Sequence, residues 1–190
     1  MFSAKRAEMG VGTLIIFIAL LLVAAVAAGV LIQTAGSLQQ KALSTGAQAT
    51  GQISTNAVVV EVSATDGTVS LTNFSAIMKL APGSDSIELD AVTLSFGTKN
   101  TSQTFTYNDN TSNPDGTTTD FGVSYLQQGA NYQAGVLVRG DVVKINFLAL
   151  RNITSGEDVR INFIPKTGTP TLTQFAIPDV ISTQRVYLYP

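Results

Sequence analysis

Only 13% of the 190 residues are charged, about half the usual share, and the net charge is −2, which argues against a nucleic-acid partner. The chain has no cysteine and no histidine, so disulfides, thiolate chemistry, most hydrolase triads and most zinc sites are excluded. The composition therefore predicts a protein that is not an enzyme and needs no cofactor.

The N-terminal part of the chain is one long apolar segment. Residues 9–40 carry no charge, and residues 11–32 are almost purely apolar. As a helix these 22 residues would be about 33 Å long, enough to cross a hydrocarbon core of about 30 Å. Lys5 and Arg6 favour a cytoplasmic N-terminus. A cleaved secretory signal and a single-pass anchor both fit this segment.

The helical pattern continues beyond Ile32, which neither a signal nor a simple anchor requires. An apolar stripe runs through Ala35, Leu38, Ala42, Ala49 and Ile53 at spacings of three, four or seven residues. We expect one helix from about residue 9 to about residue 56. Small residues four apart within it favour close packing against other helices, whereas each interior glycine costs about 1 kcal/mol relative to alanine.

These residues carry a family resemblance. Residues 5–19 (KRAEMGVGTLIIFIA), 22–32 (LVAAVAAGVLI) and 38–42 (LQQKA) resemble the N-terminus of archaeal flagellins, or archaellins. The resemblance implies a structural subunit of the archaeal flagellum, the archaellum, made as a precursor. A type IV prepilin-like signal peptidase would cut it between Ala7 and Glu8, although the family more often has glycine at the position of Ala7 and a small neutral residue at that of Glu8.

The resemblance also implies an organisation and a set of partners. Residues 1–7 are the signal peptide, 8–56 the filament-core helix and 57–190 the outer domain. The chain polymerises with itself, alone or with other archaellins, and meets the archaellum motor and assembly machinery. It lies in the cytoplasmic membrane before assembly and in the extracellular filament afterwards, where the filament rotates for swimming. The residues expected to mediate polymerisation are Gly12, Leu14, Phe17, Leu21, Ala24, Ala25, Ala28, Gly29, Ile32, Leu38, Ala42, Ala49 and Ile53.

The second part of the chain has the pattern of a β-domain. Short β-branched or aromatic runs are expected as strands at 57–63, 69–80, 87–96, 103–107, 135–138, 142–150, 158–164, 171–175 and 185–189. Turn signals such as Asp66-Gly67, Pro82-Gly83 and Thr167-Gly168 separate them. The fold class is therefore α+β, a long hydrophobic helix followed by an all-β immunoglobulin-like sandwich. Helix passes almost directly into strand near Asn56, which suggests a stiff junction.

Candidate modification and metal sites lie in this domain. Four sequons begin at Asn73, Asn100, Asn110 and Asn152, and each is an N-glycosylation signal in an exported chain. The acidic loop 108–120 places Asp109, Asn113, Asp115 and Asp120 at EF-hand ligand positions, but Pro114 stands where the turn needs glycine, so a solvated loop is the main interpretation. Arg139-Gly140-Asp141 is interpreted as a turn.

Two other functions remain open from the sequence. An adhesive archaeal type IV-like pilin would share the leader, the helix and the assembly logic. A membrane-tethered β-sandwich binding module would keep the helix uncut in the lipid.

Overall fold

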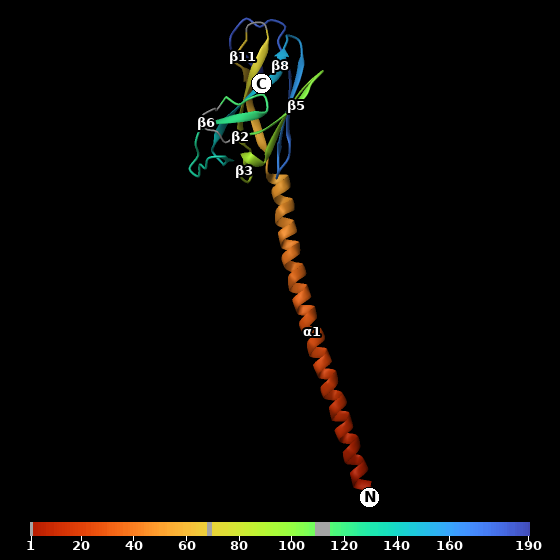
Figure 1. Cartoon of the computed structure of the whole chain (residues 1–190). Coiled ribbons are helices and arrows are strands. Elements are labelled where there is room, and N and C mark those ends of the chain that lie inside the picture. The colour runs from red at the N-terminus through yellow and green to blue at the C-terminus, as the bar shows by residue number, and fades with distance from the viewer. Residues whose placement is uncertain (1, 68–69, 109–114) are drawn as a thin grey trace. The chain divides into compact units, whose positions relative to one another are not determined.

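A computed structural model describes residues 2–67, 70–108 and 115–190, with side chains described from residue 9 onward. It contains one long helix, α1 (Phe2–Ser54), and a β-domain in which every strand lies (Figure 1). The chain divides into two compact units, Met1–Gln48 and Ala49–Pro190, so the last turns of α1 belong to the unit that holds the β-domain.

The helix α1 follows from its residue types. It is built largely from alanine, leucine and other good helix formers, and the first proline of the chain is Pro82. The expected end near residue 56 is close to the observed end at Ser54, after which β1 begins at Ala57. The predicted direct passage from helix to strand is therefore correct.

Within the described residues, the β-domain contains eleven strands and a short 3₁₀ helix. These are β1 (Ala57–Ala64), β2 (Leu71–Leu80), β3 (Ile87–Glu88), η1 (Leu89–Ala91), β4 (Val92–Thr98), β5 (Ser102–Tyr107), β6 (Asp120–Gln127), β7 (Val136–Leu137), β8 (Val142–Ile153), β9 (Asp158–Pro165), β10 (Thr171–Ala176) and β11 (Val186–Tyr189). Nine of them form a sheet in the order β10-β9-β4-β5-β6-β8-β2-β1-β11, and β3 pairs with β7.

The long sheet folds over a single aromatic core. One half, β10-β9-β4-β5, joins the other half through a short parallel pairing of β5 with β6. Side chains from both halves meet in the middle: the ring centroids of Phe74 on β2 and Phe96 on β4 lie 5.1 Å apart, and those of Phe105 on β5 and Phe147 on β8 lie 5.0 Å apart. The predicted class, a long helix followed by a β-domain, is confirmed.

Two strand predictions were wrong in detail. The expected strand 87–96 is interrupted by η1, because Leu89 turns into the core there and is fully buried. The strand β6 was not predicted, since its glycine, serine and glutamine weaken the β pattern, and its pairing with β8 supplies what its composition lacks. The expected start of the second strand at residue 69 lies outside the described residues.

Register defines two ends of the domain. Ala57 pairs with Leu80, Lys79 with Val142, and Val92 with Pro165, so these positions share the end at which α1 enters. The opposite end holds the pair Leu71 with Ile153 and the pair Thr98 with Val159. We call these the junction end and the distal end of the β-domain.

Candidate assembly and modification sites

The described part of α1 exposes almost every side chain it carries. All residues from 9 to 50 are exposed, including Leu14, Phe17 and Leu21, which are 53–59% accessible. A Cβ atom placed on Gly12, Gly29, Gly36 or Gly46 would meet nothing within 4 Å. By length and composition the segment Met9–Ser54, in which an 18-residue window has a mean hydropathy of 3.2, could cross a membrane. The residues predicted for polymerisation therefore form a surface that the single chain leaves uncovered.

The last turn of α1 is fastened to the β-domain by hydrogen bonds. Ser84, which is 4% exposed, places its Oγ atom 3.0 Å from the backbone nitrogen of Asn56, whose N–H it accepts. The same hydroxyl lies 3.2 Å from the carbonyl oxygen of Ser54 and 3.0 Å from that of Asn56. One side chain thus satisfies backbone groups at the helix end, which have no partner inside a helix.

A second set of hydrogen bonds holds the segment that follows the last turn of α1. The backbone N–H of Thr169 donates to the carbonyl oxygen of Thr55 at 2.9 Å, and the Thr171 hydroxyl donates to the carbonyl oxygen of Ala57 at 2.6 Å. Gly168, at a φ of +118°, brings its backbone so close that an added Cβ atom would lie 2.5 Å from that Thr55 oxygen. Only glycine fits this conformation and this approach without strain.

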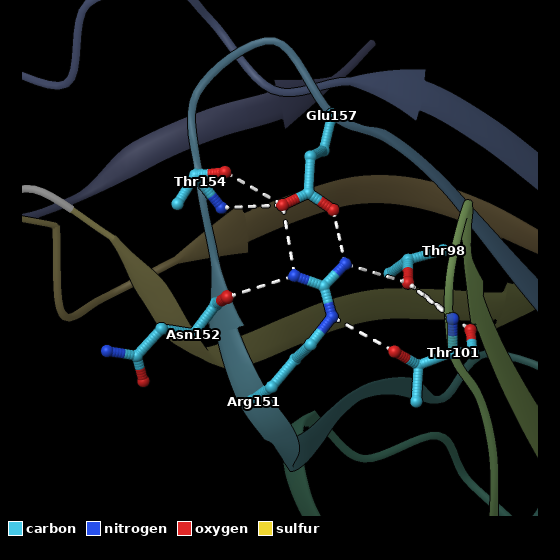
Figure 2. A network of polar contacts seen from close by, with 6 residues as sticks. All are labelled: Thr98, Thr101, Arg151, Asn152, Thr154 and Glu157. Atoms are coloured by element: carbon cyan, nitrogen blue, oxygen red, sulfur yellow. Dashed lines mark hydrogen bonds and ion pairs between the residues drawn. The ribbon is translucent and has the colours of Figure 1, made fainter.

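A charged network occupies the distal end. The Arg151 guanidinium forms a two-pronged ion pair with the Glu157 carboxylate, and its Nη1 atom lies 3.0 Å from Glu157 Oε1 (Figure 2). Arg151 also donates to the hydroxyls of Thr101 and Thr98, at 3.0 and 3.1 Å. The Thr154 hydroxyl donates to Glu157 at 2.8 Å. The network ties the β4–β5 turn to β8 and to the turn that follows β8.

The pairing changes the acidity of the carboxyl group. Hydrogen bonding from Arg151, reinforced by Thr154, lowers the pKa of Glu157 to about 2, against the opposing effect of burial. The same contact raises the pKa of Arg151. Both groups therefore stay charged over the whole physiological pH range.

Comparison with known proteins decides the family. Residues 7–175 match the archaeal-type flagellin family. The chain belongs to the archaeal-type flagellin family. It is 33% identical to flagellin B2 of Halobacterium salinarum over 92% of this chain and 90% of that protein, and 32% identical to flagellin B2 of Methanocaldococcus jannaschii over 97% and 95%.

Solved structures share the fold of this flagellin. The archaeal flagellum of Methanospirillum hungatei strain JF1 matches with a TM-score of 0.70 at 20% identity, over 95% of this chain and 99% of that one. The crystal structure of flagellin FlaB1 from Methanocaldococcus jannaschii matches with a TM-score of 0.63 at 18% identity, over 71% and 97%. The chain is accordingly a structural subunit of the archaeal flagellum, which decides against the pilin and the tethered module.

The four sequons of this flagellin differ in accessibility. Asn73 is the third residue of β2, and the hydroxyl of its sequon, on Ser75, is buried and lies 3.0 Å from Ser63 Oγ. Asn100 is exposed in the turn between β4 and β5 and borders an open cleft of about 810 Å³. Asn152 is exposed near the end of β8, with its sequon threonine bound to Glu157. Asn110 lies outside the described residues.

The other predicted sites are placed only in part. Asp109 and Asn113 of the acidic loop lie outside the described residues, as do the side chains of Ala7 and Glu8. Asp115 is exposed, while Asp120 begins β6 and accepts a hydrogen bond from the Thr106 hydroxyl at 2.9 Å. This bond gives Asp120 a structural role in the turn.

The Arg139-Gly140-Asp141 triplet is a turn, as predicted. Asp141 is 1% exposed, and its carboxylate accepts the backbone N–H groups of Gly129 and Val138 at 2.6 and 3.1 Å. A carboxylate buried in this way does not face outward to a receptor. The hydrogen-bonded roles of Ser84, Arg151 and Glu157 were missed from the sequence, because isolated serines and charges carry no positional signal.

Proposed function

We propose that this flagellin polymerises through α1, so that the helices of many copies pack together in the filament interior and the β-domains form its outer layer. The observation that carries this proposal is that every residue of α1 from 9 to 50 is exposed. Contacts between identical chains that do not close into a ring generate a helical fibre. No catalytic step belongs to this function.

The energetics favour burial of this helix. Fifteen of the described large apolar side chains lie between residues 9 and 32, and each is 48–74% exposed. Burying the exposed part of each contributes about 1–2 kcal/mol, so the segment gains tens of kcal/mol by leaving water. Lipid satisfies this requirement before assembly, and neighbouring helices satisfy it afterwards. Small residues such as Ala24, Ala25, Ala28 and Gly29 then permit the close backbone approach that packing between helices needs.

Processing is the step that we place between these two states. Cleavage between Ala7 and Glu8 by a prepilin-like signal peptidase removes Lys5 and Arg6, which favour retention of the N-terminus on the cytoplasmic side. The start of the family match at residue 7 supports this position. The charge of the remaining side chains becomes more negative by two, at −4, because two of the eleven Lys and Arg residues are lost.

The β-domain serves the outer surface of the filament. Its sequence is rich in threonine, serine and asparagine and poor in charged residues, so uncharged polar side chains make its surface hydrophilic. Asn100 and Asn152 begin the described sequons that are best placed to carry N-glycans. The membrane motor turns the filament, and the Ser84 and Thr169 contacts pass the load from the last turn of α1 to the sheet. A divalent cation in the loop 108–120 is a secondary proposal, resting only on its ligand types.

Two measurements test this function. N-terminal sequencing of the protein sheared from cells is expected to begin at Glu8, whereas a start at Met1 found only in membranes contradicts processing and assembly. Replacing Ala25 by arginine is expected to abolish filaments, because a charge would enter a dry helical core. Filaments of normal yield from Ala25→Arg would refute polymerisation through this face.

A further inference from the structure

The distal end of the β-domain carries an open cleft between the β4–β5 turn and the start of β9, which we call the distal cleft. Its volume is about 810 Å³, within the range of about 300–1,000 Å³ that ligand clefts occupy. Two glycines and six residues with polar or charged side chains line it. The six are Thr98, Lys99, Asn100, Glu157, Asp158 and Arg160. Hydroxyl, amide and charged groups therefore make this surface suitable for a polyhydroxylated ligand and not for an apolar one.

The floor of the distal cleft is bare backbone at Gly97. This residue of β4 pairs with Arg160 on β9, so both lie on the face of the sheet opposite the core residues Phe96 and Val159. Within the described residues, a Cβ atom on Gly97 would meet only the carbonyl oxygen of Arg160, at 3.9 Å. Its φ is not in the left-handed region, so the backbone would accept another residue. The absence of a side chain at Gly97 leaves space beside Arg160 and Asp158.

One guanidinium group holds two walls of the distal cleft in place. Arg151 donates hydrogen bonds to the Thr98 hydroxyl at 3.1 Å and to Glu157 Oε1 at 3.0 Å, and both acceptor residues line the cleft (Figure 2). The three exposed charged side chains of the lining form no hydrogen bond or ion pair within the part of the chain that the structure describes. Fixed walls lower the entropy cost of binding, and the unpaired groups remain available to a ligand.

An N-glycosylation signal lies on the rim of the distal cleft. Asn100 lines the cleft and lies in the exposed β4–β5 turn. Its sequon ends at Ser102, an exposed residue whose hydroxyl has no hydrogen-bond partner among the described residues. In the sequon of Asn152, by contrast, the Thr154 hydroxyl is bound to Glu157 at 2.8 Å. Of these two sequons, the one at Asn100 presents both its amide and its hydroxyl group.

Covalent attachment makes even a weak site effective. A free sugar that binds an open polar cleft loses its translational and rotational freedom, which opposes binding. A sugar attached to Asn100 has already lost most of this freedom, and its short linkage keeps it at an effective concentration of about a millimolar or more. A few hydrogen bonds to the lining of the cleft are then enough to hold it there.

We propose that Asn100 carries an N-glycan whose first sugars bind in the distal cleft, over the backbone of Gly97. Attachment joins the Nδ2 atom of Asn100 to the anomeric carbon of a phosphate-activated sugar donor. The amide loses one proton, and the carrier phosphate leaves with the bonding electron pair. The inference rests on the proposed glycosylation of the outer domain and adds the surface that binds the glycan.

Mass spectrometry and hydrogen exchange test this proposal. Protein from cells that express the chain is dissociated into subunits in mild detergent, so that a change in assembly does not alter the measurement. Peptide mass spectrometry is expected to find a glycan on Asn100. Backbone amides of residues 97–102 and 156–160 should exchange at least about fivefold more slowly in the glycosylated chain than in Asn100→Gln, because the bound sugars oppose local opening.

Filling the cleft separates binding from attachment. Gly97→Ile places a side chain over the floor, so it should keep the glycan but abolish the difference in exchange caused by Asn100→Gln. Thr104→Ile, at an exposed position of β5 outside the cleft, is the matched control and should keep that difference. The double variant Asp158→Ala/Arg160→Ala removes hydrogen-bonding groups without adding volume, and it should also reduce the difference.

The outcomes separate this proposal from the proposed function. An unmodified Asn100 would overturn the proposal, whereas polymerisation through α1 is tested independently by Ala25→Arg. A glycan on Asn100 with no change in exchange would overturn binding in the cleft. Slow exchange that persists in Gly97→Ile would contradict it too, and if Gly97→Ile does not fold, the same result in Asp158→Ala/Arg160→Ala decides the question. Loss of the slow exchange in Thr104→Ile would show that the effect does not come from the cleft.

Discussion

Neutralising Glu157 should loosen the distal end of the β-domain in a way that depends on pH. In Glu157→Gln the amide keeps an oxygen acceptor for Arg151 and Thr154 but loses the charge that makes the paired hydrogen bonds strong. The side chains of Arg151 and Glu157 are 33% and 20% exposed, so solvent screens the pair in part. We expect a loss of about 1–2 kcal/mol in the free energy of unfolding at pH 7, less than the full pKa shift would imply.

The stabilisation by the Glu157 carboxylate should decrease as the pH falls. Because the folded-state pKa of Glu157 is lowered from 4.5 to about 2, its stabilising contribution is present above pH 4.5 and is lost as the pH falls toward 2. The difference between the original protein and Glu157→Gln should therefore be constant near neutrality and shrink across this acidic window.

The assay monitors thermal and urea unfolding of the fragment 49–190 by circular dichroism. This fragment contains the whole described core. For a domain of this size the loss corresponds to a fall in Tm of roughly 3–8 °C at pH 7. Asp158→Asn, which removes a neighbouring exposed carboxylate, is the control and should change Tm little. A Glu157→Gln difference that is absent at pH 7, or equally large at pH 2, would refute the stabilising role of this ion pair.

Three further predictions concern the junction, the core and the sequons. Ser84→Ala should destabilise the fragment by about 1–3 kcal/mol, since it leaves the part-buried backbone N–H of Asn56 without its acceptor, whereas Ser86→Ala at an exposed position should not; equal urea midpoints for the two would contradict this. Phe147→Ala should cost about 3–5 kcal/mol, measured in the same way, because the ring is fully buried among other aromatic rings; a loss below 1 kcal/mol would show that the core is not packed as described. Peptide mass spectrometry of exported protein should find Asn73 unmodified if glycans are added to the folded domain, because Ser75 is buried, and a glycan on Asn73 would mean that modification precedes folding.

The sequence by itself determined the helix, the class of the fold and the family. An uncharged apolar run without proline has few alternatives to a helix, and most of the residues that carry the resemblance lie in that run, at 9–40. Most strands of the β-domain were also predictable, because β-branched runs between Gly and Pro turn signals report local preference.

Only the tertiary structure decided how these elements meet. The strand β6 depends on pairing with β8, and the break at Leu89 depends on the core that this side chain enters. The ion pair of Arg151 with Glu157 and the hydrogen bonds of Ser84 to the end of α1 depend on contacts that form across the fold. The hydrogen bond from Arg151 to Thr98, for example, joins residues 53 positions apart in the sequence. Such contacts leave no periodic pattern in the sequence, since their energy comes from geometry that exists only after the chain has folded.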